Sequence, residues 1–576
     1  MLQRIVDFLN QPNKRQPGLS RDSLISLSLL ATMAGLLSAG VITLFRLMIE
    51  VPLSHWLPAG HAEGFESLSP GLRAGIILLS TAILILVFHR LKADHRALGV
   101  GHVLQRMEQH QGYLMKRNLF AQFFGAVVAL LGGHSVGREG PAVHLGAATA
   151  SQFGQSLKVP HHRLRILAAC GVASAISASF NTPMAGVIFA MEVVLMEYSI
   201  AGFIPIILAS VTGAIVTRAV FGHEAAFIVP QFEIGSLAEI PYILALAVVC
   251  GILGSAYTAT VNGLQQWKQK PVWITWGILG IATAIISVPL PEVMGVGYDS
   301  VNAWFSGEVV IGTAIALLIG KLLLSGWASA MGFPGGLIGP TLFIGASAGA
   351  IMGQLSAYLL PEYPTNIGFY SMLGMGAMMA AVLRAPLAAL MALLELTANP
   401  NIIMPGMLAI VIASLTVSEV FHLPSVFRVQ TRLNLEANPV NRMLRNTWVA
   451  EIMDQSYALC ERHLHPEAAQ LILQDGPEWI IINEEIKFIM PAAELAKLLA
   501  AHENDDEELD LLLLPAPRQD SAPISLQANL QNALDRMQSA DLEWLVVHRD
   551  EKMNKIVGLV SRQMIEQHYS YKPASA

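Results

Sequence analysis

Residues 137–141 of the chain read Gly-Arg-Glu-Gly-Pro, and they place an arginine and a glutamate between two strongly apolar segments. The segments at 124–133 and 142–150 contain no aspartate, glutamate, lysine or arginine. An ionisable pair at bilayer depth is costly, so it is found mostly where it lines a polar pathway. The glycines allow unwound backbone, and a helix that begins here turns its free N–H groups towards an anion. The stretch therefore predicts a broken helix at an ion site within a membrane.

The composition around this stretch is that of a membrane protein. Of the 576 residues, 53% are hydrophobic and 13% are charged, and the mean hydropathy is +0.52, far from an average soluble domain. Leu24–Phe45, Ala74–Phe88 and Pro241–Thr260 carry no charge and are close to the length that spans a bilayer. Further apolar segments lie at about 166–190, 201–217, 271–290, 309–320, 341–359, 366–383 and 402–418. We therefore predict an all-α polytopic membrane protein with at least ten apolar segments.

Charge and cysteine content indicate how the chain is oriented in the membrane and which kinds of site are not expected. Lys14, Arg15 and Arg21 precede the first apolar segment, which predicts a cytoplasmic N-terminus, in the cell (inner) membrane, rather than a cleaved signal peptide. The three cysteines are scattered, so we expect neither a disulfide framework nor a metal site. The net charge of −7 does not indicate binding to nucleic acid.

The chain changes character near residue 445, where the apolar segments stop. Beyond this point Glu467–Leu473 and Ala528–Met537 have helical patterns. Trp479–Ile482, Leu545–Val547 and Ile556–Val560 have the pattern of short buried strands. The sequence thus predicts a C-terminal α/β domain that lies in the cytoplasm.

The apolar part contains an internal repeat in two blocks. The first block repeats at an offset of 203 residues (395 − 192) and the second at 199 (336 − 137). Two halves with matching Gly/Pro-interrupted segments indicate a binding site where the repeats meet. In the first block Gly171, Ala178, Pro183, Ala185 and Glu192 recur as Gly374, Ala381, Pro386, Ala388 and Glu395. In the second block Gly137, Gly140 and Pro141 recur as Gly336, Gly339 and Pro340.

Three ordered motifs resemble those of the CLC chloride channel and transporter family. They are Gly133–His144 (GHSVGREGPAVH), Phe180–Gly186 (FNTPMAG) and Gly332–Pro340 (GFPGGLIGP), and the resemblance covers about residues 20–435. It implies a homodimer with one anion pathway per subunit. It also implies a transmembrane domain of two inverted repeats built from broken and re-entrant helices. The expected boundaries are a cytoplasmic segment 1–22, a transmembrane domain 23–435, repeats at about 23–222 and 240–430, and a tail resembling two CBS domains at 446–510 (degenerate) and 515–572.

The resemblance also assigns candidate anion-binding residues. The backbone N–H groups near Arg138, Glu139, Leu337 and Ile338 would form an outer anion site, and N–H groups replace a hydration shell without a full counter-charge. Close approach of the backbone would rest on Gly137, Gly140, Gly336 and Gly339. Glu139 corresponds to the family's gating glutamate, whose carboxylate occupies the anion site and leaves it on protonation. The alternative for Glu139 is a structural ion pair with Arg138.

Three positions depart from the pattern of the family's exchangers. Val100 and Phe427 stand where a serine and a tyrosine hydroxyl contact the central anion, although Ser425 is close to the second position in the chain. A hydrogen bond to a charged group contributes about 1.5–3 kcal/mol, so we expect weaker central anion binding. Val193 stands where a glutamate relays protons. Glu192 and Glu197 are the candidate acids that would take its place.

We therefore favour a pH-gated passive chloride channel, with an H⁺/Cl⁻ antiporter as the alternative. The expected partners are chloride or another small monovalent anion, protons in the exchanger, membrane lipid and a second copy of the chain. We expect no enzymatic activity, but a polytopic membrane enzyme using Glu139, His134 and His144, or a cation-coupled symporter, is a distant alternative. For His144 we expect a helix-packing hydrogen bond rather than a proton relay. No cofactor is expected, because Met564 stands where the ribose-binding aspartate of a CBS adenine-nucleotide site would fall.

Overall fold

The computed structural model divides the chain into two compact units, Met1–Leu433 and Asn434–Ala576. Most of the expected N-terminal segment 1–22 lies outside the described residues. These are residues 21–59, 63–198, 200–222, 227, 239–359, 366–431, 444, 447–484, 487–501, 508–513, 517–549 and 555–570.

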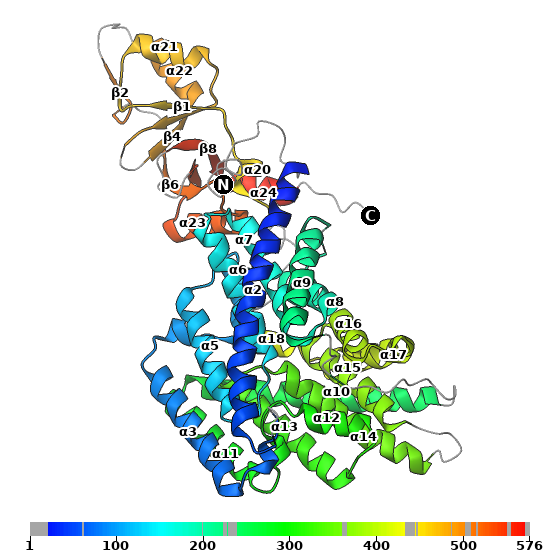
Figure 1. Ribbon diagram of the computed structural model, residues 1–576. Coiled ribbons are helices and arrows are strands. Elements are labelled where there is room, and N and C mark those ends of the chain that lie inside the picture. The colour runs from blue at the N-terminus through cyan, green and yellow to red at the C-terminus, as the bar shows by residue number, and fades with distance from the viewer. Residues whose placement is uncertain are drawn as a thin grey trace. The chain divides into compact units, whose positions relative to one another are not determined.

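The first unit is helical throughout the described residues (Figure 1). Eight of its described helices are long and apolar enough to cross a membrane, and four shorter apolar helices accompany them. Each of the ten predicted apolar segments coincides with helix. The main helices are α2 (Arg21–Trp56), α3 (Pro70–His89), α4 (Gly99–Gln109), α5 (Lys116–Leu131), α6 (Glu139–Ser156), α7 (His161–Phe180), α8 (Pro183–Phe189), α9 (Ile200–Phe221), α10 (Ile240–Leu264), α11 (Val272–Ser287), α12 (Tyr298–Phe305), α13 (Ile311–Ala330), α14 (Ile338–Leu359), α15 (Ile367–Leu383), α16 (Pro386–Thr397), α17 (Ile403–Leu415) and α18 (Val426–Thr431).

The apolar segment predicted at 166–190 forms two helices, because the chain breaks between α7 and α8. Asn181 adopts a left-handed backbone with φ of 59° and ends α7, and Pro183 begins α8. Proline is favoured in the first turn of a helix, where its missing N–H costs nothing. The same break recurs one repeat later, where Arg384 has φ of 57° before Pro386. The break falls at the polar residues Asn181 and Thr182, within an otherwise apolar segment.

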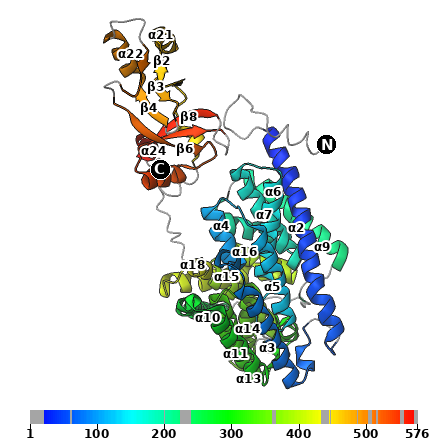
Figure 2. The same ribbon diagram turned by 90° about the vertical axis from the view of Figure 1, so that its left-hand side faces the viewer.

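Helices of the two halves follow in the same order and pack in the same way. Contacts link α6 with α7 and α14 with α15, and likewise α7 with α9 and α15 with α17. Figure 2 shows α6 and α7 beside α2 in the first half. The repeated glycines lie at these helix contacts: Gly171 faces the carbonyl of Gly146, and Gly374 faces that of Gly345. Small residues let membrane helices approach closely, which explains why the glycines recur.

The second unit contains a six-stranded sheet in the order β1-β3-β4-β6-β7-β8. Two β-α-β-β-α units share it, and β4 joins them by pairing antiparallel with β6. The predicted helices and strands of the tail are confirmed, and this α/β region is consistent with a CBS pair. The elements are β1 (Tyr457–Cys460), α21 (Pro466–Gln474), β3 (Trp479–Ile482), β4 (Lys487–Pro491), α22 (Ala492–Ala501), β6 (Gln519–Ser525), α23 (Leu530–Ala540), β7 (Trp544–His548), β8 (Ile556–Ser561) and α24 (Arg562–Ser570).

A small second sheet in the tail is held by an ion pair. Strands β2 (His463–Leu464) and β5 (Leu509–Asp510) pair antiparallel. The Arg462 guanidinium donates to both carboxylate oxygens of Asp510 at 2.8–3.0 Å. These hydrogen bonds lower the pKa of the Asp510 carboxyl to about 2. The pair therefore stays ionised at any physiological pH.

Candidate functional site

The two glycine-rich stretches of the repeat meet each other inside the first unit. Gly137 N–H donates to the Gly336 carbonyl and Gly336 N–H donates to the Gly137 carbonyl, both at 2.7 Å, which makes an isolated antiparallel bridge. Helices α6 and α14 begin two residues beyond the bridge, at Glu139 and Ile338. The first N–H groups of a helix have no partner within it. Two helix N-termini thus bring free N–H donors to one place, where they favour an anion.

Glycine is required at this junction because the two backbones nearly touch. A Cβ atom added to Gly140 would lie 2.6 Å from the Cα of Gly336. One added to Gly339 would lie 2.8 Å from Oε2 of Glu139. A side chain at Gly140 would therefore push the two backbones apart, and one at Gly339 would displace the Glu139 carboxylate.

Glu139 is buried, with 1% of its surface exposed, and its carboxylate is held by donors from the second half. Oε1 accepts a hydrogen bond of 2.5 Å from the Tyr298 hydroxyl, and Oε2 accepts one of 3.2 Å from the Gly339 N–H. The carboxylate therefore lies at the N-terminus of α14, where the sequence predicts an anion. A negatively charged side chain and a free anion would compete for these same donors.

Arg138 has a nearer acidic partner than Glu139. Its Nη1 lies 2.6 Å from Oε1 of Glu50 on α2, whereas its Nε lies 3.9 Å from Oε1 of Glu139. Glu50 also accepts a 3.1 Å hydrogen bond from Nε of Arg46. The alternative in which Glu139 serves mainly as the ion-pair partner of Arg138 is therefore disfavoured.

The position of Tyr298 depends on residues that the sequence analysis did not single out. Oε2 of Glu63 accepts hydrogen bonds from the N–H groups of Gly297 at 2.6 Å and Tyr298 at 3.2 Å. The fully buried Lys321 donates to the carbonyls of residues 295 and 296 at 2.7 and 3.0 Å. The sequence could have indicated Lys321, because a lysine within an apolar helix rarely lacks a function. Tyr298 lies in no motif, and its role follows only from the fold.

A cavity of ≈660 Å³, which we call the vestibule, reaches this junction and is lined in part by α4 and α18. Val100, Phe427, Gly140 and Leu337 all line it. The structure thus brings together the two positions that lack hydroxyls and three further expected anion-binding positions, Gly140, Gly336 and Leu337. Ser425 is not among the lining residues, and its hydroxyl accepts a 3.4 Å hydrogen bond from the Arg428 N–H. Ser329 and Thr431 are the hydroxyl residues that line the vestibule, and they were not predicted.

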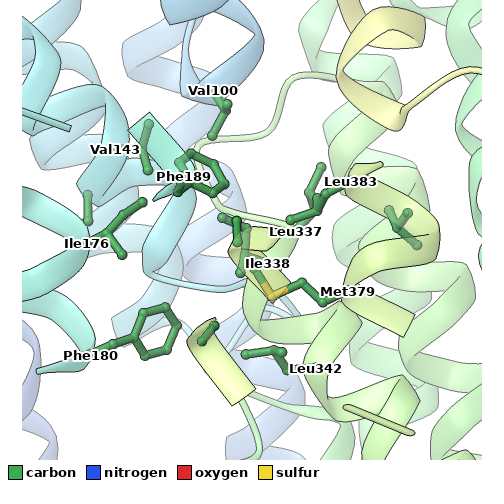
Figure 3. Close-up of a cluster of buried hydrophobic side chains, with 14 of the residues drawn as sticks. Val100, Val143, Ile176, Phe180, Phe189, Leu337, Ile338, Leu342, Met379 and Leu383 are labelled. Carbon is green, nitrogen blue, oxygen red and sulfur yellow. The ribbon is translucent and has the colours of Figure 1, made fainter. Parts of the chain in front are cut away.

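Apolar side chains lie beside the vestibule and around the N-terminus of α14. Figure 3 shows Val100 near Val143 and Phe189, with Leu337 and Ile338 beside them. Ile338 also lines a small, entirely apolar cavity of ≈20 Å³. Leu337 and Ile338 therefore contribute backbone, not side chains, to any anion site here.

The candidate proton acids do not contact Glu139. Glu192 accepts hydrogen bonds from the N–H groups of Leu387 at 3.2 Å and Ala388 at 2.7 Å, so its carboxylate caps α16. Its repeat counterpart Glu395 caps α8 in the same way. Val193 is buried and Glu197 is half-buried. The recurrence of Glu192 in the repeat is thereby explained as mutual capping of the two halves.

A helical membrane unit with inverted repeats and facing helix N-termini defines a class of anion-transport proteins. Residues 76–418 match the family model described as voltage gated chloride channel, which covers more than half of the chain. The chain therefore belongs to the voltage-gated chloride channel (CLC) family and is an integral membrane protein of chloride transport.

Relatives of the chain include exchangers. The H(+)/Cl(−) exchange transporter ClcA of Vibrio vulnificus is 28% identical over 66% of this chain and 84% of its own length. A ClcB-like chloride channel protein of Ralstonia nicotianae is 29% identical over 55% of this chain and 76% of its own. Two solved structures share the fold. A slow cyanobacterial Cl⁻/H⁺ antiporter matches with a TM-score of 0.62 and 23% identity over 73% of this chain and 100% of that one. A eukaryotic CLC transporter matches with a TM-score of 0.60 and 20% identity over 94% and 98%.

Proposed function

We propose that this protein exchanges chloride for protons along a pathway controlled by Glu139. The observation that carries the proposal is the position of the Glu139 carboxylate between the Tyr298 hydroxyl and the Gly339 N–H. A carboxylate in this position excludes a free anion. Protonation of Glu139 removes the negative charge that holds the carboxylate in place. One side chain thus binds a proton when it yields its place to chloride, which is the elementary requirement for exchange.

The sequence favoured a passive chloride channel, with an H⁺/Cl⁻ antiporter as the alternative. We now prefer the antiporter. The channel was favoured because Val100, Phe427 and Val193 lack groups that exchangers use. Those absences remove two anion donors and one proton acceptor, but backbone N–H groups still serve an anion. The exchange transporters among the relatives also favour the alternative. In addition, a passive channel needs a continuous open path, whereas Val100, which lines the vestibule, lies in a cluster of buried apolar side chains (Figure 3).

The test is the reversal potential of the reconstituted full-length protein under opposed chloride and proton gradients. We expect a value displaced from the chloride equilibrium potential that moves with the proton gradient, and uphill proton movement driven by chloride. Glu139→Gln serves as the control and should pass chloride without protons. A reversal potential equal to the chloride value, unmoved by the proton gradient, would restore the channel interpretation.

A further inference from the structure

Two buried histidines lie side by side next to the vestibule. His102 on α4 lines the vestibule, and His144 on α6 is fully buried behind it. Nδ1 of His102 lies 3.0 Å from Nε2 of His144, a hydrogen-bond distance, and the ring centroids are 5.1 Å apart. The pair therefore joins the aqueous vestibule to the helix that begins with Glu139.

The second ring nitrogen of His144 is without a protein partner. Its Nδ1 is buried and makes no hydrogen bond within the described part of the chain. An unpaired buried polar atom is costly unless water reaches it. His144 follows Glu139 by five positions on α6, roughly 7.5 Å along the helix axis. Five positions also correspond to about 140° around the helix, so the two side chains leave α6 in different directions and a proton would have to pass between them through water.

Imidazole is suited to passing a proton through such a pair. The neutral ring donates at one nitrogen and accepts at the other, so it takes up a proton on one side and releases one on the other. We propose that His102 and His144 carry protons between the vestibule and Glu139, in place of the glutamate that Val193 replaces. This inference rests on the proposed exchange function.

The transfer balances at each step. Water in the vestibule gives a proton to Nε2 of His102, whose Nδ1 proton passes to Nε2 of His144. The Nδ1 proton of His144 then passes through water to the Glu139 carboxylate. Each ring is then left with its proton on Nε2, and the starting tautomers return when the ring turns towards water, loses the Nε2 proton and takes up one at Nδ1.

The charges around the pair are mostly positive. Arg106 and His110, on or next to the end of α4, act electrostatically on His102, which in turn acts on His144. Glu192 lies on the segment that packs against α4, but its carboxylate is engaged at α16. Cations disfavour a lasting charge on either ring, so the pair would hold a proton only in passing. The remaining charged groups on the vestibule wall, on α4 and on the helices packed against α4 and α6 are Arg96, Lys268, Lys270, Glu108, Arg428, Lys116, Arg117, Arg46, Glu50, Arg163 and Arg165.

The experiment measures chloride flux and chloride-driven proton uptake in liposomes containing the full-length protein. The variants are His144→Gln and His102→Gln. His134→Gln is the matched control, because His134 is also buried and its Nδ1 is also unpaired, but its Nε2 contacts the hydroxyls of Ser80 and Thr81 instead of a second histidine. We expect both pair variants to keep chloride flux within about threefold and to lose at least about tenfold in proton flux. The control should keep the wild-type ratio of protons to chloride.

The outcomes separate this inference from the proposed function. If the wild-type protein moves protons uphill and His144→Gln or His102→Gln does so at the same ratio, the histidine route is wrong and exchange stands. If the wild-type protein moves no protons uphill, both proposals fail. Equal losses of chloride and proton flux in both variants would show a structural role only and would overturn the route.

Discussion

At the scale of single residues, the gating glutamate of the first repeat accepts its hydrogen bonds from residues of the second repeat. Glu139 begins α6 in the first repeat, yet both of its hydrogen-bond donors, Tyr298 and Gly339, belong to the second. Glu63 and Lys321 in turn fix the turn before Tyr298. Release of the carboxylate therefore requires loss of the tyrosine hydrogen bond as well as neutralisation of its charge.

Tyr298→Phe should make transport faster and less dependent on acid. The ring would keep its edge contact with Phe227, at 5.1 Å between centroids, while the hydroxyl donor is lost. A hydrogen bond to a charged group contributes about 1.5–3 kcal/mol, so release of Glu139 should be easier by about tenfold or more. Chloride efflux measured across a range of pH values tests this.

A matched control for Tyr298→Phe is Tyr242→Phe, which removes a hydroxyl that donates to the Met352 carbonyl at 2.6 Å, away from Glu139. The control should keep the wild-type pH profile. An unchanged profile in Tyr298→Phe would mean that this hydroxyl does not hold the gate.

At the scale of elements, the halves are joined by reciprocal capping of two helices. Glu192 accepts from the first N–H groups of α16, and Glu395 accepts from those of α8. Helices α8 and α16 also pack against each other. A carboxylate at a helix N-terminus is stabilising because it meets unpaired N–H groups and the positive end of the helix dipole.

Glu192→Gln and Glu395→Gln should lower the free energy of unfolding by similar amounts, about 0.3–2 kcal/mol each. The two sites are equivalent in geometry, and each substitution removes a charge from a helix N-terminus. Thermal unfolding of the purified protein in detergent, followed by tryptophan fluorescence, measures the effect. Neither variant should change the ratio of protons to chloride. Loss of proton transport in Glu192→Gln alone would return Glu192 to the proton pathway.

At the scale of the whole molecule, we expect two copies with separate pathways. The apolar side chains Ile204, Leu208 and Ile215 on α9, and Met407 and Val411 on α17, are exposed in one copy at helical spacing. In a dimer with two-fold symmetry, each subunit would keep its own junction between α6 and α14.

Cross-linked dimers with one blocked subunit should retain about half of the flux. A blocked subunit is obtained with Val100→Cys, which puts a thiol on the vestibule wall where an impermeant thiol reagent can reach it. The native Cys170, Cys250 and Cys460 are buried, so we expect the reagent not to label them. Chloride efflux before and after labelling is the measurement. Complete loss of flux after labelling one subunit would indicate a shared pore.

Much of this architecture could be predicted from sequence, because it depends on local composition and on residues close in the chain. Apolar runs of bilayer length predicted the helices, and recurring glycines and prolines predicted two halves that meet at Gly137 and Gly336. The strands and helices of the tail followed from short hydrophobic patterns. Across 166–190 the apolar composition predicted the segment but not the residues at which α7 ends and α8 begins.

The tertiary structure alone decided which side chains act together. Tyr298 and Glu139 are separated by 159 residues, and His102 and His144 by 42, and no local pattern links either pair. Glu192 appeared as a candidate proton acid until the fold showed it capping a helix 196 residues away. Periodicity and composition determine which segments enter the membrane. The hydrogen-bond partners of a buried polar group are set by how those segments pack, because each such group must find its partner across the core.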